Sequence, residues 1–196
     1  MSDEALALVE FNSVAGGLFA LDALVKRAPI EVLEANLVEP GKYLVLIAGG
    51  VAEVSEALTA ATGDTNRVTD KMMLARAHPG LIEGLRGALD LRDAESLDTV
   101  GVIEATSIAA TLRACDRSLK DAAVSLSGIR VTGGLGGRAY FVVYGRHEDV
   151  LSAIDVARDQ LADRVHATEC IARPHPEMVR WILTTPTFSI NADERG

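Results

Sequence analysis

The stretch EATSIAATLRACDRSLKDA at residues 104–122 has a counterpart earlier in the chain, EFNSVAGGLFALDALVKRA at residues 10–28. The two stretches share 8 identical residues in 19 positions at a constant offset of 94. Unrelated sequences of average composition would share roughly one or two. We therefore interpret the pair as parts of a duplicated unit. The identities are Glu10/Glu104, Ser13/Ser107, Ala15/Ala109, Leu18/Leu112, Ala20/Ala114, Asp22/Asp116, Lys26/Lys120 and Ala28/Ala122.

The duplication extends through almost the whole chain. Gly49 and Val54 match Gly145 and Val150 at an offset of 96, and residues 75–79 match residues 172–176 at an offset of 97. Each copy therefore has the size of a small domain. We predict domains at residues 1–94 and 95–190 and a tail at residues 191–196, with the charged stretch 86–98 as the linker.

Composition and charge restrict the partners and the compartment. The net charge of -9 and the pI near 4.9 disfavour binding to nucleic acid or to anionic membranes. The first residues do not resemble a signal peptide, and no apolar run is long enough to span a membrane. The two cysteines fit a reducing compartment, so we expect a cytoplasmic protein.

Each copy predicts the order strand, helix, strand, strand, helix, strand, followed by a short helix after His-Pro. In the first copy these are residues 6–11, a helix capped by Asn12 or Ser13, then 30–38, 43–48, 51–61 and 68–75. In the second copy, residues 139–144, 147–161 and 165–172 continue the same order. This order is ferredoxin-like, an α/β (α+β) fold with helices on one face of an antiparallel-containing sheet. Helical spacing predicts that Val14, Leu18, Leu21 and Val25 face the core, like Ile108, Leu112, Cys115 and Leu119 in the second copy.

The cysteines and histidines do not form a site for catalysis or for a metal. Cys115 and Cys170 take the positions of Leu21 and Met73, so we predict apolar core positions rather than nucleophiles or ligands. The histidines lack the spacing of a zinc site, and we expect no metal.

The repeated carboxylates offer the remaining route to catalysis. Glu10/Glu104 and Asp22/Asp116 are better explained by hydrogen bonds or contacts than by acid–base chemistry. We therefore expect no catalytic residues and no enzyme activity.

The glycine-rich stretch GGLGG at residues 133–137 is similar in composition to a phosphate-binding loop. Such loops open onto a helix, whereas a strand follows here, which weakens a nucleotide-binding interpretation. We interpret the stretch as a hairpin tip that must stay small or must move, with an ordinary flexible turn as the alternative.

Four motifs resemble one family: DALVKRA at residues 22–28, PGK at 40–42, TGGLGGR at 132–138 and IARPH at 171–175. They are similar to bacterial microcompartment shell proteins with two tandem BMC domains, most of all to the trimers of the propanediol-utilisation compartment. The resemblance implies a homotrimer whose six domains form a flat pseudohexagonal tile. The tile would pack with other shell proteins, hexamers and vertex pentamers, in the wall of a protein-bounded organelle.

The resemblance also implies roles for particular residues. Small metabolites would cross a central pore lined by Val38, Glu39, Pro40, Gly41, Lys42, Thr132, Gly133, Gly134, Leu135, Gly136, Gly137 and Arg138. Assembly at the tile edge would involve Lys26, Lys120, Arg76, Arg173, His78 and His175.

One position departs from the propanediol-utilisation trimers, which carry a cysteine before Pro-Gly-Lys and hold an iron–sulfur cluster there. This chain has Glu39, and a carboxylate cannot supply the thiolates of such a cluster, so we expect no cofactor. Three Glu39 side chains would instead ring the pore and repel anions. The longer glycine tip would alternatively offer N–H groups to an anion, and the sequence leaves both alternatives open.

Two other functions compete with the shell tile. The first is a soluble trimeric ferredoxin-like protein that binds a small regulatory molecule between subunits. The second is an enzyme, which ranks third because the sequence shows no nucleophile, base or metal set.

Overall fold

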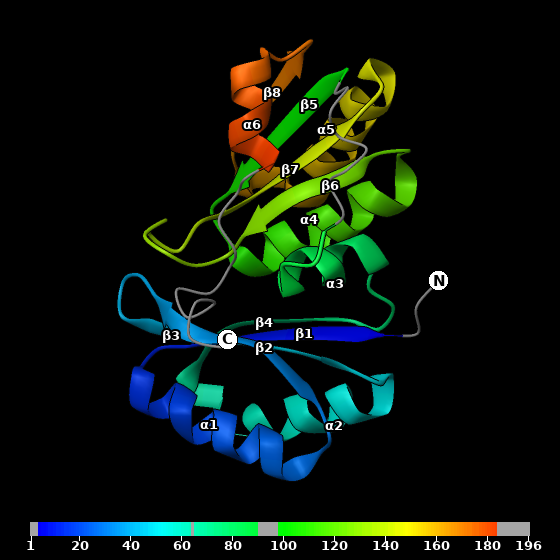
Figure 1. Cartoon of the computed structure of the whole chain (residues 1–196). Helices are drawn as coiled ribbons and strands as arrows, with labels where there is room; N and C mark the ends of the chain where they lie inside the picture. The colour runs from blue at the N-terminus through cyan, green and yellow to red at the C-terminus, as the bar shows by residue number, and fades with distance from the viewer. Residues whose placement is uncertain (1–3, 64, 90–97, 184–196) are drawn as a thin grey trace. The chain divides into compact units, whose positions relative to one another are not determined.

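The computed structural model describes residues 4–63, 65–89 and 98–183 (Figure 1). Its described residues divide into two compact units. One contains the residues up to Ala77 together with Thr132–Gly137, and the other runs from His78 to Val131 and from Arg138 onward. The predicted tail and the predicted boundary at residues 94 and 95 lie outside the described residues, as does most of the predicted linker.

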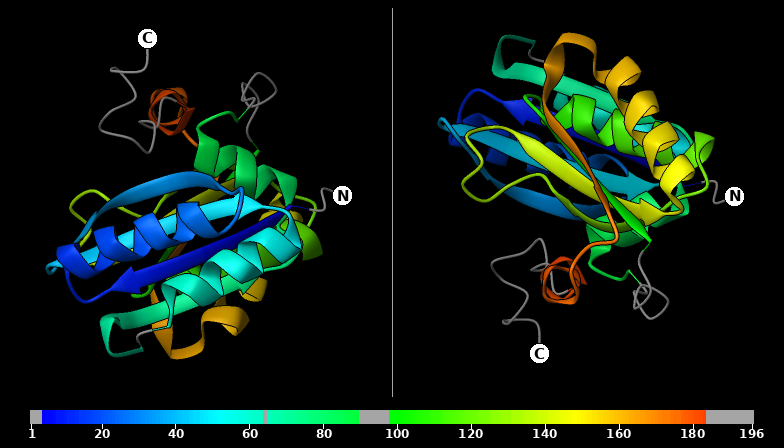
Figure 2. Two further views of the ribbon diagram at one scale, coloured as in Figure 1. Left: turned by 90° about the horizontal axis from the view of Figure 1, so that it is seen from below. Right: turned by 90° about the horizontal axis from the view of Figure 1, so that it is seen from above.

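The first unit is a four-stranded antiparallel sheet in the order β2-β3-β1-β4, with α1 and α2 on one face (Figures 1 and 2). Its elements are β1 (Ala5–Phe11), α1 (Val14–Arg27), β2 (Glu31–Val38), β3 (Lys42–Gly49), α2 (Val51–Ala61) and β4 (Val68–Leu74), with a short 3-10 turn at Thr65–Arg67. Alternate residues of β1, such as Ala7, Val9 and Phe11, pack with Val45 and with the helices in the core.

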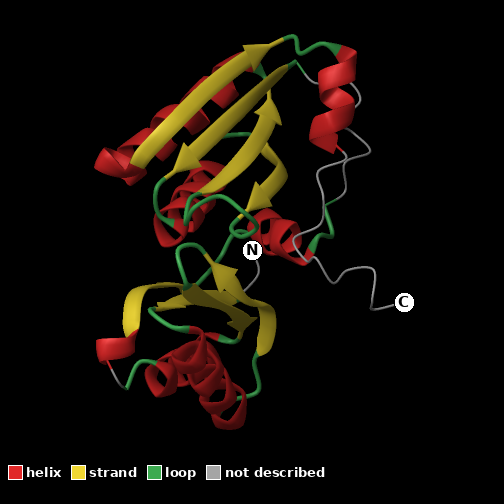
Figure 3. Ribbon diagram, turned by 90° about the vertical axis from the view of Figure 1, so that its left-hand side faces the viewer, coloured by secondary structure: helices red, strands yellow, loops and turns green. Residues whose placement is uncertain are grey.

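The second unit repeats this arrangement in the order β6-β7-β5-β8. Its elements are β5 (Thr99–Ala105), α4 (Ile108–Asp121), β6 (Ser125–Arg130), β7 (Ala139–Gly145), α5 (His147–Leu161), a 3-10 turn at Ala162–Arg164, β8 (Val165–Ala172) and α6 (Pro176–Leu183). Figure 3 shows α4 and α5 together on one face of its sheet. The predicted ferredoxin-like order is confirmed in both copies.

Local details repeat as well. Ser13 and Ser107 cap α1 and α4, and their hydroxyl oxygens accept from the N–H groups of Gly16 and Ala110 at 3.2 and 3.3 Å. The pairing of the first strand with the last shifts register just after Glu10, and the same shift follows Glu104. Both repeated carboxylates therefore stand directly before a break in the regular strand pairing.

The helix α3 (Pro79–Arg86) follows the first copy in sequence but packs with the second unit, against β6 and α4. A Cβ atom on Gly84 would lie 2.6 Å from Leu126 Cδ2, so the absence of a side chain lets α3 lie directly on β6. The end of the first copy thus completes the cover of the second.

Of the four residues predicted to form the core face of α1, only Leu21 packs against the core of the first unit. Gly16, Gly17, Ala20 and Leu24 are buried, whereas Val14, Leu18 and Val25 are exposed. Gly17 contacts Tyr43 of β3, where any side chain would collide with the ring, so the small residues bring the helix close to the sheet. The matching face of α4, formed by Ile108, Leu112, Cys115 and Leu119, is buried as predicted.

The described helices include none that is long and apolar enough to cross a membrane.

Candidate pore loops

The predicted pore residues form two hairpin tips. Tip 1, residues 38–42, connects β2 to β3, and tip 2, residues 132–138, connects β6 to β7. Glu39, Pro40 and Gly41 are exposed at the first tip, as are Gly133, Gly134 and Gly136 at the second. Although tip 2 belongs to the second copy, Thr132–Gly137 pack within the first unit. The structure therefore brings the two predicted pore loops together.

Glu39 joins the two tips. Its Oε2 accepts the main-chain N–H of Gly136 at 2.9 Å. A Cβ atom on Gly137 would lie 2.9 Å from the carbonyl oxygen of Glu39, and the φ of +80° at Gly137 also favours glycine. The glycines of tip 2 thus permit close approach to tip 1, and a carboxylate of the chain itself takes one loop N–H group.

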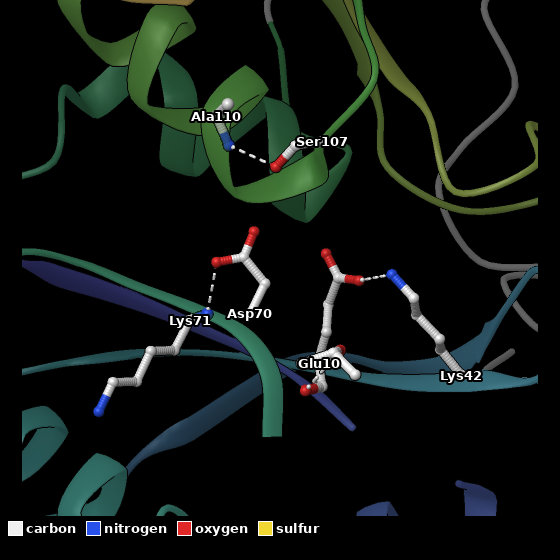
Figure 4. Close-up of polar contacts among 7 residues, drawn as sticks. Glu10, Lys42, Asp70, Lys71, Ser107 and Ala110 are labelled. Atoms are coloured by element: carbon white, nitrogen blue, oxygen red, sulfur yellow. Dashed lines mark hydrogen bonds and ion pairs between the residues drawn. The ribbon is translucent and has the colours of Figure 1, made fainter. Parts of the chain in front are cut away.

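The cation at the end of each tip is paired with a repeated glutamate. Lys42 Nζ lies 3.0 Å from Oε2 of Glu10, a buried residue of β1 (Figure 4). In the second copy Arg138 Nη1 lies 2.8 Å from Oε1 of Glu104. The prediction that these carboxylates make contacts is confirmed, because both hold the base of a tip to the central strand.

The second copy adds a histidine to this arrangement. Arg138 Nη1 lies 2.6 Å from His166 Nε2, and because arginine can only donate, the histidine nitrogen accepts. The matching residue in the first copy is Thr69, whose hydroxyl donates to the carbonyl oxygen of Glu10 at 3.1 Å. His166 thus contacts the cation and Thr69 contacts the main chain of the glutamate, each from the last strand of its sheet.

The predicted tile-edge residues occur in repeated pairs, with one member in each copy. Lys26 and Lys120 bind Asp22 and Asp116 at 2.6 Å. Both members of the first pair are exposed, whereas in the second pair Asp116 is buried. Arg76 and Arg173 are exposed just after β4 and β8.

The two repeated histidines stand at the start of the short helices. His78 Nδ1 accepts the N–H of Gly80 at 3.1 Å, and His175 Nδ1 accepts that of Glu177 at 3.3 Å. Burial lowers the pKa of His78, Lys120 lowers it further, and Asp116 and Glu83 partly oppose the shift. Each histidine thus caps a helix. Its position before proline predicts a role in the fold or in assembly but does not identify the cap.

The cysteines differ in their burial. Cys115 is completely buried in α4, and burial raises the pKa of its thiol, so the predicted core position is confirmed. Cys170 of β8 is only half-buried, like its counterpart Met73, so the core prediction is wrong there because this strand lies at the edge of the sheet.

The tips do not offer the ligands of an iron–sulfur cluster. Neither tip contains a cysteine, and the carboxylate of Glu39 is bonded to Gly136. Elsewhere in the described part of the chain, no group of three or more His, Cys, Asp or Glu residues is arranged to hold a metal ion.

Comparison with known proteins identifies the family to which this fold belongs. The chain matches the BMC domain family twice, over residues 5–77 and 99–174. It is 31% identical over 185 residues to the bacterial microcompartment shell protein PduT of Citrobacter freundii, covering 92% of this chain and 98% of the relative.

Solved structures agree with this match. A microcompartment protein from Desulfitobacterium hafniense DCB superposes with a TM-score of 0.85 at 33% identity, covering 91% of this chain and 99% of that one. A fused permuted hexameric shell protein from the RMM microcompartment, at 19% identity, a TM-score of 0.59 and 83% coverage of each chain, shares the fold. The chain, with its two BMC domains in tandem, belongs to the family of bacterial microcompartment shell proteins.

Proposed function

We propose that three copies of the chain form a pseudohexameric tile in the shell of a cytoplasmic microcompartment, with a central pore for small metabolites. A duplicated chain lets three copies fill six nearly equivalent places around a closed ring. The observation that carries the proposal is the hydrogen bond from Gly136 to Glu39, because it joins within one chain the two hairpin tips that would surround the pore.

The charges at the tips indicate what the pore selects. Lys42 and Arg138 are each paired with a glutamate, whereas Glu39 is exposed and, among the described residues, receives only a neutral N–H group. Three Glu39 carboxylates around one axis would form an acidic ring that disfavours anions, as charged rings do in channels. Between the two alternatives from the sequence, we therefore favour the acidic ring, since the glycine loop already binds a carboxylate of its own chain.

The proposed tile has no catalytic role and no iron–sulfur cluster. The relatives are shell proteins, and the donors at the tips do not fit a cluster. We expect protein purified anaerobically to show no visible absorbance above its aromatic bands. A broad band near 400 nm that bleaches with dithionite would contradict this.

Negative-stain electron microscopy of the untagged protein, with light scattering on the same samples, tests the tile. We expect a trimer mass and, at rising concentration, sheets or tubes of hexagonal outline. If discrete trimers remain, the protein is mixed with a hexameric shell protein. Failure to co-assemble would favour a trimeric protein that binds a small regulatory molecule between its subunits.

A further inference from the structure

The same helix face is covered in one copy and bare in the other. In α4, Leu112 and Leu119 are 0% and 6% exposed, whereas the matching Leu18 and Val25 of α1 are 51% and 49% exposed. The edge strands beside these helices differ in the same way, because most residues of β6 are buried and most residues of β2 are not. The same apolar helix face, present in both copies, is therefore buried by other residues in the second unit and exposed in the first.

Part of the cover in the second unit is α3. A Cβ atom on Gly80 would lie 3.9 Å from Leu119 Cδ1, and one on Gly84 would lie 3.3 Å from Ile129 Cγ2. At the offset of 94, Leu119 and Ile129 correspond to Val25 and Ala35. At the offset of 97, α3 corresponds to α6, the last described helix of the chain. α6 contacts β6 of its own unit.

A polar junction accompanies this packing. The main-chain N–H of His78 donates to Asp116 Oδ1 at 2.7 Å, while Asp116 Oδ2 binds Lys120. All three residues are repeated, as His175, Asp22 and Lys26.

The second copy of the junction is incomplete within one chain. Asp22 binds Lys26 at the same 2.6 Å, but its side chain is 58% exposed, against 8% for Asp116. Within the described residues, no main-chain N–H donates to Asp22. The chain therefore holds one complete junction and, in different units, the two halves of another.

We propose that these halves meet between chains: α6 of one copy packs on α1 and β2 of a second copy, where the N–H of His175 donates to Asp22. The occupant is a second copy because the missing half of the junction is present once at the other end of the same sequence. Such head-to-tail contacts form a ring when the rotation between copies closes, as it would in the proposed trimer. This interface rests on the proposed trimer and names the surface that forms it.

The first test changes the two matched junctions separately and measures mass by analytical ultracentrifugation and thermal unfolding by circular dichroism. We expect Asp22→Ala to raise at least tenfold the concentration at which half of the chain is trimeric, with little change in monomer unfolding. The double variant Leu18→Asp, Val25→Asp should be monomeric and folded. Asp116→Ala should lower the unfolding temperature yet leave the trimer, and Ser55→Asp on exposed α2 serves as the charge control.

A second test uses two single-cysteine variants, Val25→Cys and Glu177→Cys, each with Cys170→Ser. These positions match Leu119 and Gly80, which face each other in the second unit. A short bis-maleimide should link them only when the two variants are mixed, so any cross-linked dimer joins different chains. The buried Cys115 is retained in both.

The outcomes separate this interface from the tile itself. A wild-type trimer that survives the α1 double variant unchanged, or that gives no cross-link in the mixture, overturns the interface alone. A wild-type chain that is monomeric at every concentration overturns the proposed trimer and the interface with it.

Discussion

Glu39 is the residue on which the two tips depend. Removing its carboxylate in Glu39→Ala frees the Gly136 N–H, and an exposed bond of this kind contributes about 1 kcal/mol. We expect amide hydrogens of tip 2 to exchange about fivefold faster, measured by hydrogen exchange with mass spectrometry. Glu39→Gln, which keeps an acceptor without the charge, should lie between Glu39→Ala and wild type.

The exposed Glu169→Gln of β8 serves as the control for loss of a carboxylate. Tip 2 exchanging equally fast in wild type and Glu39→Ala would mean that the bond does not hold the loop. The same variant also tests selectivity, since binding of an anionic probe that does not rise in Glu39→Ala would count against the acidic ring.

The two glutamate–cation pairs should differ in their contribution to stability because Glu10 is far more buried than Glu104. Lys42→Ala leaves a buried carboxylate without its counter-charge, at a cost of about 2 to 3 kcal/mol. Arg138→Ala leaves a partly solvated one, at a cost of about 1 kcal/mol. Urea unfolding of both variants checks the order, and equal losses would mean that burial of Glu10 does not set the difference.

The helix α3 carries a pH dependence through its cap. The pKa of His78 lies below its unfolded value of about 6.5 because burial disfavours the imidazolium. The contribution of His78 to the free energy of unfolding is therefore fully present above about pH 6.5 and is lost as the pH falls through the pKa of the folded state. Neutral Nδ1 is the acceptor for Gly80, and protonation removes this cap, which is worth about 1 kcal/mol.

The variant His78→Asn keeps a capping oxygen but does not titrate. We expect the unfolding temperature of wild type to fall more than that of His78→Asn between pH 7.5 and pH 5.5, measured by circular dichroism. Carboxylates titrate in both proteins, so the difference between them isolates the histidine. Parallel curves would contradict a titrating cap.

At the level of elements, local sequence predicts most of the fold. Capping serines, prolines and apolar runs predicted where the helices and strands lie. Because the sequence is duplicated, the prediction for one copy could be compared with that for the other. Three of the four residues in the predicted core face of α1 are exposed, because Val14, Leu18 and Val25 show helical spacing as clearly as Ala20 and Leu24 do. Spacing reports that a face is apolar, whereas the pair Gly16 and Gly17 marks the side that approaches the sheet.

The contacts at the tips lay beyond sequence reasoning for a different reason. Glu39 and Gly136 are 97 residues apart, and Glu10 and Lys42 are 32 apart, so no local pattern reports them. The repetition of Glu10 as Glu104 in the sequence indicated that both make a similar contact. The structure identifies the partner as the cation at the end of each hairpin tip.

At the scale of the whole molecule, charge opposes assembly. Each chain has a net charge of -9, so tiles that meet edge to edge repel one another unless cations lie at the edge. Lys26 is a candidate, because its counterpart Lys120 stays exposed even beside the complete junction, so the same junction between chains would leave Lys26 accessible. We expect Lys26→Ala to form normal trimers by light scattering but no sheets in electron micrographs at about 0.1 M salt.

Lys71→Ala is the matched control, because it removes one positive charge from an exposed position of β4. If edge position matters, Lys71→Ala still forms sheets, and higher salt restores Lys26→Ala only in part, because screening reduces repulsion without replacing the lost contact. If both variants lose sheets alike and both recover in salt, the total charge of the tile governs assembly and Lys26 has no special place in it.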